Sequence, residues 1–324
     1  MSGIAATSRG AGRIPRPAEI SSDRIRRRRP GRGSGLAALV WVGPALALII
    51  GVVVYPVIAL VRASFERYSL TGLRKGPAGT ANYTAVLHHA SLGVVATNTV
   101  VWVVAVVAIT MLAGLAVAQL VSKDFAGRRL VRWALIVPWA ASLVITARLF
   151  TLIYDYYHGA LNTVLLRLHL VSEPVDFLGD DRWAMASMIA VGVFVSVPFT
   201  AYVLLAGINS IPGDVYEAAR MDGAGAWTTY RSITLPLLRP TLLVAALLNI
   251  IYVFNSFPII YTLNDRNPGY LHDTSITFMY KLAFKSAERD VGMSAAAGVC
   301  NVLFMLVVVA VYLRLVKWGE GRQP

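Results

Sequence analysis

Charged residues are scarce in this chain: they make up 15% of its 324 residues, against 56% for hydrophobic residues. Soluble domains carry about 25% charged residues, so this composition excludes an ordinary soluble fold. Cysteine is rarer still. Cys300 is the only one and lies in an apolar run, which excludes a disulfide framework and a cysteine-based metal site. We expect the Cys300 side chain to have only a packing role.

Motifs that carry chemistry are also missing. The sequence contains no HExxH zinc motif and no GxxxxGK[ST] phosphate loop, and its five histidines lie outside the apolar runs without paired-ligand spacing. We therefore predict that the chain is not an enzyme, binds no metal and holds no cofactor. Any energy from ATP must then come through a partner.

Ionisable residues are almost absent from the long apolar runs, although a proton- or sodium-coupled carrier keeps acids in the middle of its spans. Arg148, near the end of the third run, is the exception. Two interpretations of Arg148 stay open. Its guanidinium reaches toward the membrane interface, or it lies on a translocation path.

What the sequence does contain is apolar runs of about 20 residues, the length of a membrane-spanning helix. They predict an all-α, polytopic membrane protein with six transmembrane helices. Prolines inside the runs predict kinks, which membrane helices tolerate. The six spans lie near residues 36–61, 92–121, 131–154, 183–207, 241–263 and 292–316.

The domain organisation follows from these runs. Residues 36–316 are predicted to form the transmembrane domain, residues 1–35 a disordered basic segment and residues 317–324 a short tail. The basic segment contains Arg26-Arg27-Arg28-Arg29 and several Gly, Pro and Ser, which cannot bury a core. Such a cluster beside a span sets topology and attracts anionic lipid, so we expect a membrane-lipid contact and no nucleic-acid partner.

Basic residues are unevenly distributed among the connecting segments. If the amino terminus is cytoplasmic, the segments on that side contain 19 Arg and Lys against 7 Asp and Glu, while the opposite segments contain 10 of each kind. Membrane proteins retain the positive excess inside. The net charge of +13 therefore predicts a multi-pass protein with both termini cytoplasmic.

The connection between the fourth and fifth spans is polar and rich in turn residues. Asp214 suits the N-cap of a first helix over residues 215–221, and Asp222-Gly223 suits the turn that ends it. A second helix over residues 224–233 is expected to end at Leu235-Pro236. The two helices would lie across the membrane face.

This connection, the 211–240 loop, resembles the EAA loop of binding-protein-dependent ABC importers, in the form EAA..DGA..W..F..I.LP.L.P of carbohydrate permeases. The resemblance covers most of the chain from about residue 36. It departs after the fifth span, where many members read Thr-x-Gly-Gly-Pro and this chain reads Thr-Leu-Asn-Asp-Arg-Asn-Pro-Gly. The matching residues are Glu217, Ala218, Ala219, Asp222, Gly223, Ala224, Trp227, Ile233, Leu235, Pro236 and Pro240, with Tyr230 at the aromatic position.

The resemblance implies an ABC type I importer permease fold and a role as one permease subunit of an ATP-driven carbohydrate importer in a bacterial inner membrane. The implied partners are a second, homologous permease subunit, two ATP-binding subunits that hold ATP and Mg²⁺, and an extracytoplasmic solute-binding protein. The residues implied to contact an ATPase subunit are Glu217, Ala218, Ala219, Asp222, Gly223 and Ala224.

Substrate contacts in the resembling permeases come from the spans on either side of this loop. Amides and hydroxyls hydrogen-bond sugar hydroxyls, and aromatic rings cover the apolar faces of a sugar. Spacings of three and four predict one shared helical face for the fifth-span residues. The alternative is that these polar groups only join neighbouring helices. The path residues are Ser196 and Phe199 in the fourth span and Asn249, Tyr252, Asn255 and Ser256 in the fifth.

Three other functions stay open. An ion-coupled or facilitative carrier would work alone, and we expect mid-span acids or broken-helix pairs in it, neither of which the sequence indicates. An ABC permease for a glycerol phosphoester or an oligopeptide is the second; a phosphate substrate would favour Arg or Lys on the path, where only Arg148 is available. A membrane scaffold, the third, would leave the polar face of the fifth span without a purpose.

Overall fold

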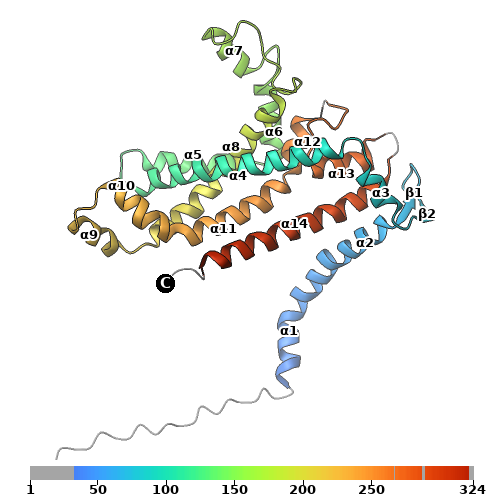
Figure 1. The fold of residues 1–324 in the computed structure, drawn as a ribbon, viewed down its shortest axis with the longest axis horizontal. Helices are drawn as coiled ribbons and strands as arrows, with labels where there is room; N and C mark the ends of the chain where they lie inside the picture. The colour runs from blue at the N-terminus through green and yellow to red at the C-terminus, as the bar shows by residue number, and fades with distance from the viewer. Residues whose placement is uncertain (1–32, 266, 287–288, 321–324) are drawn as a thin grey trace, which may run out of the picture. The chain divides into compact units, whose positions relative to one another are not determined.

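The computed structural model describes residues 33–265, 267–286 and 289–320 (Figure 1). The chain divides into two units, Met1–Tyr55 and Pro56–Pro324. The first contains α1 (Gly33–Leu48) and the π-helical segment η1 (Ile49–Val54). Helix begins at Gly33, so residues 33–35 do not belong to a disordered segment; the rest of that predicted segment lies outside the described residues.

The second unit is mostly helical. This agrees with the predicted all-α class; the small amount of strand is a two-stranded antiparallel hairpin, in which Glu66 lies opposite Pro77. The final helix also runs into the predicted tail, because it ends at Glu320. In chain order the elements are α2 (Tyr55–Ser64), β1 (Glu66–Tyr68), β2 (Arg74–Pro77), α3 (Ala81–Leu87), α4 (Leu92–Ser122), α5 (Arg128–Ala140), α6 (Leu143–Ile153), α7 (Ala160–Arg167), α8 (Ala184–Asn209), α9 (Gly213–Met221), α10 (Ala226–Thr229), η2 (Tyr230–Thr234), α11 (Leu235–Phe254), α12 (Phe257–Leu263), α13 (Ser275–Phe284) and α14 (Val291–Glu320).

Five continuous helical runs among the described residues are long and apolar enough to cross a membrane. A sixth span is obtained when α5 and α6, bent by 101°, are taken as one broken span. The predicted count of six is therefore confirmed only with that pair included. The five continuous runs are Val40–Ser64, Leu92–Ser122, Ala184–Asn209, Ala226–Phe254 and Val291–Val316.

Two of the predicted spans are not straight helices. The span over 131–154 bends at Ala141 and Ser142, whose backbones are extended, three residues after Pro138, which lacks the N–H of a helical hydrogen bond. The span over 241–263 stops at Phe254, and α12 starts again at Phe257 with Pro258 in its first turn. The expectation of no broken-helix pairs is therefore wrong.

The core of the second unit lies where α4 packs along α8. Trp102 of α4 is buried and its Nε1 donates a hydrogen bond to the carbonyl of Val253, 2.9 Å away, which also fastens α11. Gly192 of α8 makes room for this ring: a Cβ there would lie 2.6 Å from the Trp102 side chain. Small residues at such crossings let helices approach closely in a membrane.

Both ends of this helix group carry polar connections. α9 and α10 lie at one end of α8 and α11, and α12 and α13 lie at the other (Figure 1). The helices between them are in mutual contact, since α11 packs against both α4 and α8. Residues at the two ends are thus joined through α8 and α11.

Candidate functional site

A cavity of about 290 Å³ opens between α5, α8 and α11. We call it the helix pocket. It brings together four of the six predicted path residues, and none of its lining residues carries a charge. Ser196 and Asn249 are buried, whereas the rings of Phe199 and Tyr252 are partly exposed. The lining residues are Trp139, Val195, Ser196, Phe199, Leu248, Asn249 and Tyr252.

Asn249 joins α11 to α8 at this pocket. Its Nδ2 donates to the Oγ1 of Thr200 and to the carbonyl of Ala245, both at 2.9 Å. The Thr200 hydroxyl in turn donates to the carbonyl of Ser196. These contacts occupy the Nδ2 donor of Asn249 and fix its side chain. The Nδ2 group therefore joins neighbouring helices, as the alternative interpretation expected. The Oδ1 acceptor takes no hydrogen bond from the described residues.

Asn255 and Ser256 do not lie on the helical face that carries Asn249. The spacing argument assumed one helix, but α11 ends at Phe254; Asn255 follows as its C-cap and Ser256 is the N-cap of α12. The Nδ2 of Asn255 donates to the carbonyl of Ile251 at 2.8 Å. Neither residue lines the helix pocket. Trp139, which was not among the predicted path residues, does line it.

The 211–240 loop begins with helix α9, which ends in a capping motif. The N-cap of α9 is Pro212, and Asp214 lies in the first turn, so Asp214 is not the cap that its position suggested. At the other end Gly223 adopts a φ of +76°, and the amides of Gly223 and Ala224 donate to the carbonyls of Arg220 and Ala219. This is a Schellman motif, in which glycine avoids the left-handed penalty of other residues.

The six predicted coupling residues divide by exposure. Ala219, on the inner face of α9, is buried, and Ala224 is half-buried. Nearby, Met221 and Trp227 are exposed by 88% and 70%. An exposed methionine and tryptophan beside a capped helix form a surface suited to a partner. The coupling residues exposed beside them are Glu217, Ala218, Asp222 and Gly223.

The second helix of the loop does not end at Leu235-Pro236, contrary to the prediction. α10 passes through the π-helical η2 directly into α11, giving one helical run from Ala226 to Phe254. Irregular turns accommodate prolines in membrane helices because neighbouring groups take up the freed carbonyls. The hydroxyl of Tyr216 lies 3.3 Å from the Oγ1 of Thr234, which ties α9 to this run.

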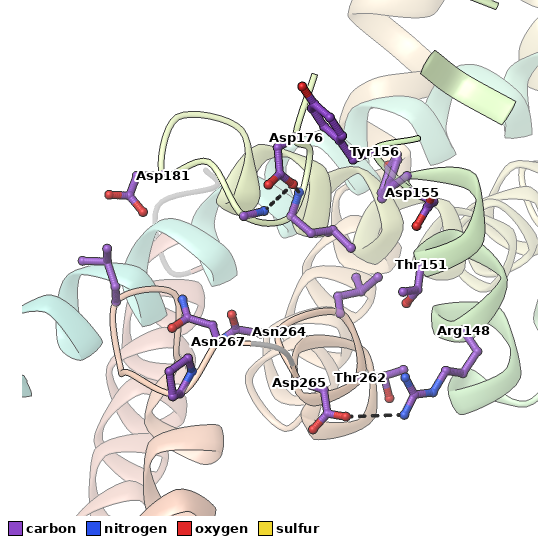
Figure 2. A pocket seen from close by; sticks show the side chains of 16 residues that line it. Arg148, Thr151, Asp155, Tyr156, Asp176, Asp181, Thr262, Asn264, Asp265 and Asn267 are labelled. Carbon is purple, nitrogen blue, oxygen red and sulfur yellow. Dashed lines mark hydrogen bonds and ion pairs between the residues drawn. The ribbon is translucent and has the colours of Figure 1, made fainter. Parts of the chain in front are cut away.

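A second cavity, of about 520 Å³, lies at the opposite end of the helix group, and no sequence signal indicated it (Figure 2). We call it the loop pocket. Figure 2 shows Arg148 pointing toward Asp265, with 3.6 Å between their charged groups. Its lining residues are Arg148, Thr151, Tyr154, Asp155, Tyr156, Asp176, Leu178, Gly179, Asp181, Thr262, Leu263, Asn264, Asp265, Asn267, Pro268 and Leu271.

Asp265 is held ionised at the edge of the loop pocket. The Nζ of Lys285 lies 2.7 Å from its Oδ1. This hydrogen bond is the main reason why the pKa of the Asp265 carboxyl lies below its usual value, and it raises the pKa of Lys285 to about 12. Arg148 adds a smaller contribution of the same sign. Arg148 lines the loop pocket and does not line the helix pocket.

Buried polar contacts hold the connection between α12 and α13. Lys281 pairs with Asp273 at 2.7 Å, with both side chains almost fully buried. Asp273 also accepts from the Nδ2 of Asn264. His272 is buried too; its Nδ1 lies 3.0 Å from the Nδ2 of Asn267 and its Nε2 lies 3.1 Å from Asp181, across from the α7–α8 segment.

Long apolar helices, an uncharged cavity between them and a capped polar loop at one end define a multi-spanning subunit of a membrane transport system. The chain belongs to the family of binding-protein-dependent transport system inner membrane components, whose model matches residues 110–320, more than half of it. The predicted family is thereby confirmed, and the chain is an inner-membrane transport permease.

Named relatives and a solved structure agree. The chain is 32% identical over 294 residues to the sulfoquinovosyl glycerol transport system permease protein of Agrobacterium fabrum, covering 88% of this chain and 92% of the relative. It is 33% identical over 274 residues to the trehalose/maltose transport system permease protein of Thermococcus litoralis, covering 84% and 90%. A bacterial ABC transporter involved in importing the acidic polysaccharide alginate superposes with a TM-score of 0.77, at 22% identity, over 88% of this chain and 96% of that one. The predicted importer permease fold is confirmed.

Proposed function

We propose that this chain forms half of the membrane path of an ATP-driven, binding-protein-dependent carbohydrate importer. The observation that carries the proposal is the helix pocket, where Ser196, Asn249 and Tyr252 offer uncharged hydrogen-bonding groups beside the rings of Trp139 and Phe199. Sugars need this combination, because their hydroxyls require donors and acceptors while their ring faces stack on aromatic residues. The carbohydrate names of the relatives support the same substrate class.

The lining of the helix pocket also argues against the other substrates. A phosphoester would bring its charge into a cavity whose lining contains neither Arg nor Lys, and an unpaired charge in such a place is costly. An ion-coupled carrier would need an acid there, and none lines this cavity. Neutral hydrogen-bonding cargo fits the lining best.

Coupling to ATP is assigned to the 211–240 loop. α9 presents Glu217, Ala218, Asp222 and Gly223 to solvent, beside the exposed Met221 and Trp227. We assign this surface to the groove of an ATP-binding subunit. ATP and Mg²⁺ are then bound and used by two such subunits, and this chain holds no cofactor of its own.

The remaining partners follow from the same function. We assign both termini and the 211–240 loop to the cytoplasm, and the excess of Arg and Lys in these segments supports this orientation. The loop pocket then faces outward, toward an extracytoplasmic solute-binding protein. A second, homologous permease subunit would complete the path beside the helix pocket, where the rings of Phe199 and Tyr252 are partly exposed.

Uptake by the assembled transporter in membrane vesicles tests the proposal. The panel contains trehalose, maltose, sulfoquinovosyl glycerol and alginate oligosaccharides. We expect ATP-dependent uptake of a saccharide, and we expect Tyr252→Ala to lower it at least about 10-fold, equal to about 1.4 kcal/mol of binding. Asn255→Ala is the control, because Asn255 lies outside the helix pocket; its uptake should stay within about twofold of the parent.

Two results would contradict the carbohydrate importer. Uptake that continues when the ATP-binding subunits are left out would indicate a carrier. Equal loss in Tyr252→Ala and Asn255→Ala would show that the helix pocket has no special part in the path.

A further inference from the structure

Four aromatic side chains lie together on α12 and α13, and the proposed function does not use them. The ring of Phe257 stacks on that of Tyr261, with 4.9 Å between the ring centroids and 17° between the planes. Tyr280 of α13 lies 4.9 Å from both of these rings and 4.9 Å from the ring of Phe284. We call these four residues the ring cluster. Three of them are half-buried and Phe284 is 63% exposed, so ring surface remains for a further contact.

Paired charges border the ring cluster. The Nζ of Lys285 lies 5.0 Å from the centroid of the Tyr261 ring and 2.7 Å from the Oδ1 of Asp265. Arg148 approaches the other oxygen of the same carboxylate, at 3.6 Å. The three charged side chains are 32–58% exposed. Because ion pairs exposed to lipid chains are costly, this edge of the ring cluster faces water or a polar ligand.

The ring cluster continues the helix pocket along the same two broken spans. Residues of α5 and α11, the first halves of these spans, line the helix pocket. The second halves, α6 and α12, pack against each other. Phe257 and Tyr261 lie on α12, and Arg148 lies on α6. The spans that line the helix pocket before their breaks therefore carry rings and a charged edge after them.

We propose that the ring cluster is a second saccharide contact, a surface on which a sugar ring of the cargo stacks while Asp265 and Lys285 hydrogen-bond its hydroxyls. This proposal rests on the proposed function. Aromatic faces take the apolar face of a sugar, a carboxylate accepts hydrogen bonds from hydroxyls, and an ammonium donates to them. Since α12 and α13 lie at the end of the helix group opposite α9 and α10, the sugar would stack here on its way to the helix pocket (Figure 1).

Protection of a thiol by saccharides tests this contact. In a Cys300→Ser background, Phe284→Cys places a thiol at the exposed edge of the ring cluster. The assembled transporter, without its solute-binding protein, is treated in right-side-out vesicles with the impermeant reagent sulfonatoethyl methanethiosulfonate. The four saccharides of the uptake panel are the probes, and sorbitol, a polyol without a ring, is the solute control. We expect a transported saccharide to slow the reaction about 10-fold when present at about ten times its dissociation constant. Leu168→Cys, exposed at the C-cap of α7, should react at one rate throughout.

Variants of Tyr280 show whether the rings are responsible. Tyr280→Leu removes the ring that contacts the other three, whereas Tyr280→Phe retains it. The saccharide concentration needed for protection should rise about 10-fold in Tyr280→Leu and stay within about twofold in Tyr280→Phe. Tyr252→Ala removes a ring from the helix pocket and should leave the protection unchanged, which separates the two contacts. Lys285→Cys, beside the Tyr261 ring, repeats the measurement if Phe284→Cys fails to assemble.

Each contrary result overturns the saccharide contact. A thiol that the reagent does not reach would show that lipid or the second permease subunit covers the ring cluster. Equal slowing by sorbitol, or equal protection in Tyr280→Leu and Tyr280→Phe, would show that no sugar stacks on the rings. The uptake panel separates this proposal from the previous one: uptake of a saccharide that gives no protection overturns the ring cluster alone, whereas no uptake of any saccharide overturns the carbohydrate importer.

Discussion

The two polar connections that flank α11 and α12 are built in opposite ways. In the α12–α13 connection, polar side chains bind one another: Lys281 with Asp273, Asp273 with Asn264, and His272 with Asn267. In the 211–240 loop, Glu217 and Asp222 make no side-chain hydrogen bond or ion pair with any described residue, and Met221 and Trp227 are exposed. The first connection pairs these side chains within the chain, whereas the second leaves its side chains exposed, where a partner can contact them.

This difference predicts where substitutions act. A buried ion pair that loses one member leaves a charge without compensation, so damage to the α12–α13 connection reduces stability. An exposed side chain on a capped helix contributes little to folding, so damage to the 211–240 loop reduces coupling instead. Stability and transport measured on the same variants separate the two.

The largest loss of stability is expected for Lys281→Met. Asp273 would remain buried without its partner, at a cost of about 3–5 kcal/mol. Thermal unfolding of the detergent-purified protein measures it, with Lys285→Met, whose side chain is 42% exposed, as the matched control. Adding Asp273→Leu to Lys281→Met should recover part of the loss. An unchanged melting curve for Lys281→Met would refute the contrast between the connections.

The largest loss of transport without loss of stability is expected for Glu217→Lys. The reversed charge lies on the surface assigned to the ATP-binding subunit, so uptake should fall about 10- to 100-fold, the size of a coupling free energy of 1–3 kcal/mol. ATP hydrolysis and the melting curve should persist. Glu173→Lys makes the same charge change on another exposed residue. Normal uptake in Glu217→Lys would refute the assignment of this surface to the ATP-binding subunit.

A smaller effect is expected for Gly223→Ala. The left-handed φ of +76° costs an L-residue about 1–2 kcal/mol, although no atom lies within 4 Å of an added Cβ. The turn after α9 should loosen, and uptake should fall less than in Glu217→Lys. Gly223→Asn should recover much of the loss, because asparagine tolerates this conformation. If alanine and asparagine behave alike, the conformation is not what matters there.

The smallest effect is expected for Arg148→Gln. The Arg148 side chain is 58% exposed, and exposed ion pairs contribute about 0–1 kcal/mol. The pKa of Asp265 is lowered, so its carboxylate is charged and pairs with Arg148 above the ordinary carboxyl pKa. This stabilisation is lost as pH falls through the lowered pKa. The difference in melting temperature between the parent and Arg148→Gln should therefore be the same at pH 5 and at pH 8. A difference that grows between these values would require another titrating group.

The sequence predicted the elements that depend on local chemistry. The helix over 215–221 and its end at Asp222-Gly223 are confirmed within two residues, because a left-handed glycine after a helix is a strong local signal. Hydropathy also located the apolar runs. It could not reveal the bend between α5 and α6, since composition changes little when a span changes direction.

Sequence spacing could predict which residues of the candidate site lie together only when they share one helix. Asn249 and Tyr252 both lie on α11 and line the helix pocket, so helical spacing grouped these two; Ser196 and Phe199 reach the same pocket from α8. Asn255 and Ser256 lie beyond the end of α11; Pro258, in the first turn of α12, was the available signal. The loop pocket depends on contacts between distant segments, such as His272 with Asp181, which no local pattern predicts.

The uninterrupted run from α10 through η2 into α11 has a mechanical consequence. Asn249 lies 15 residues beyond Thr234, the last residue of η2, which is about 22 Å at 1.5 Å per residue. A tilt of about 5° about η2 would carry Asn249 sideways by about 2 Å, the difference between a made and a broken hydrogen bond. The run thus has the geometry of a lever arm: its short end is α10, tied to α9 through the Tyr216–Thr234 contact, and its long end carries Asn249 in the wall of the helix pocket.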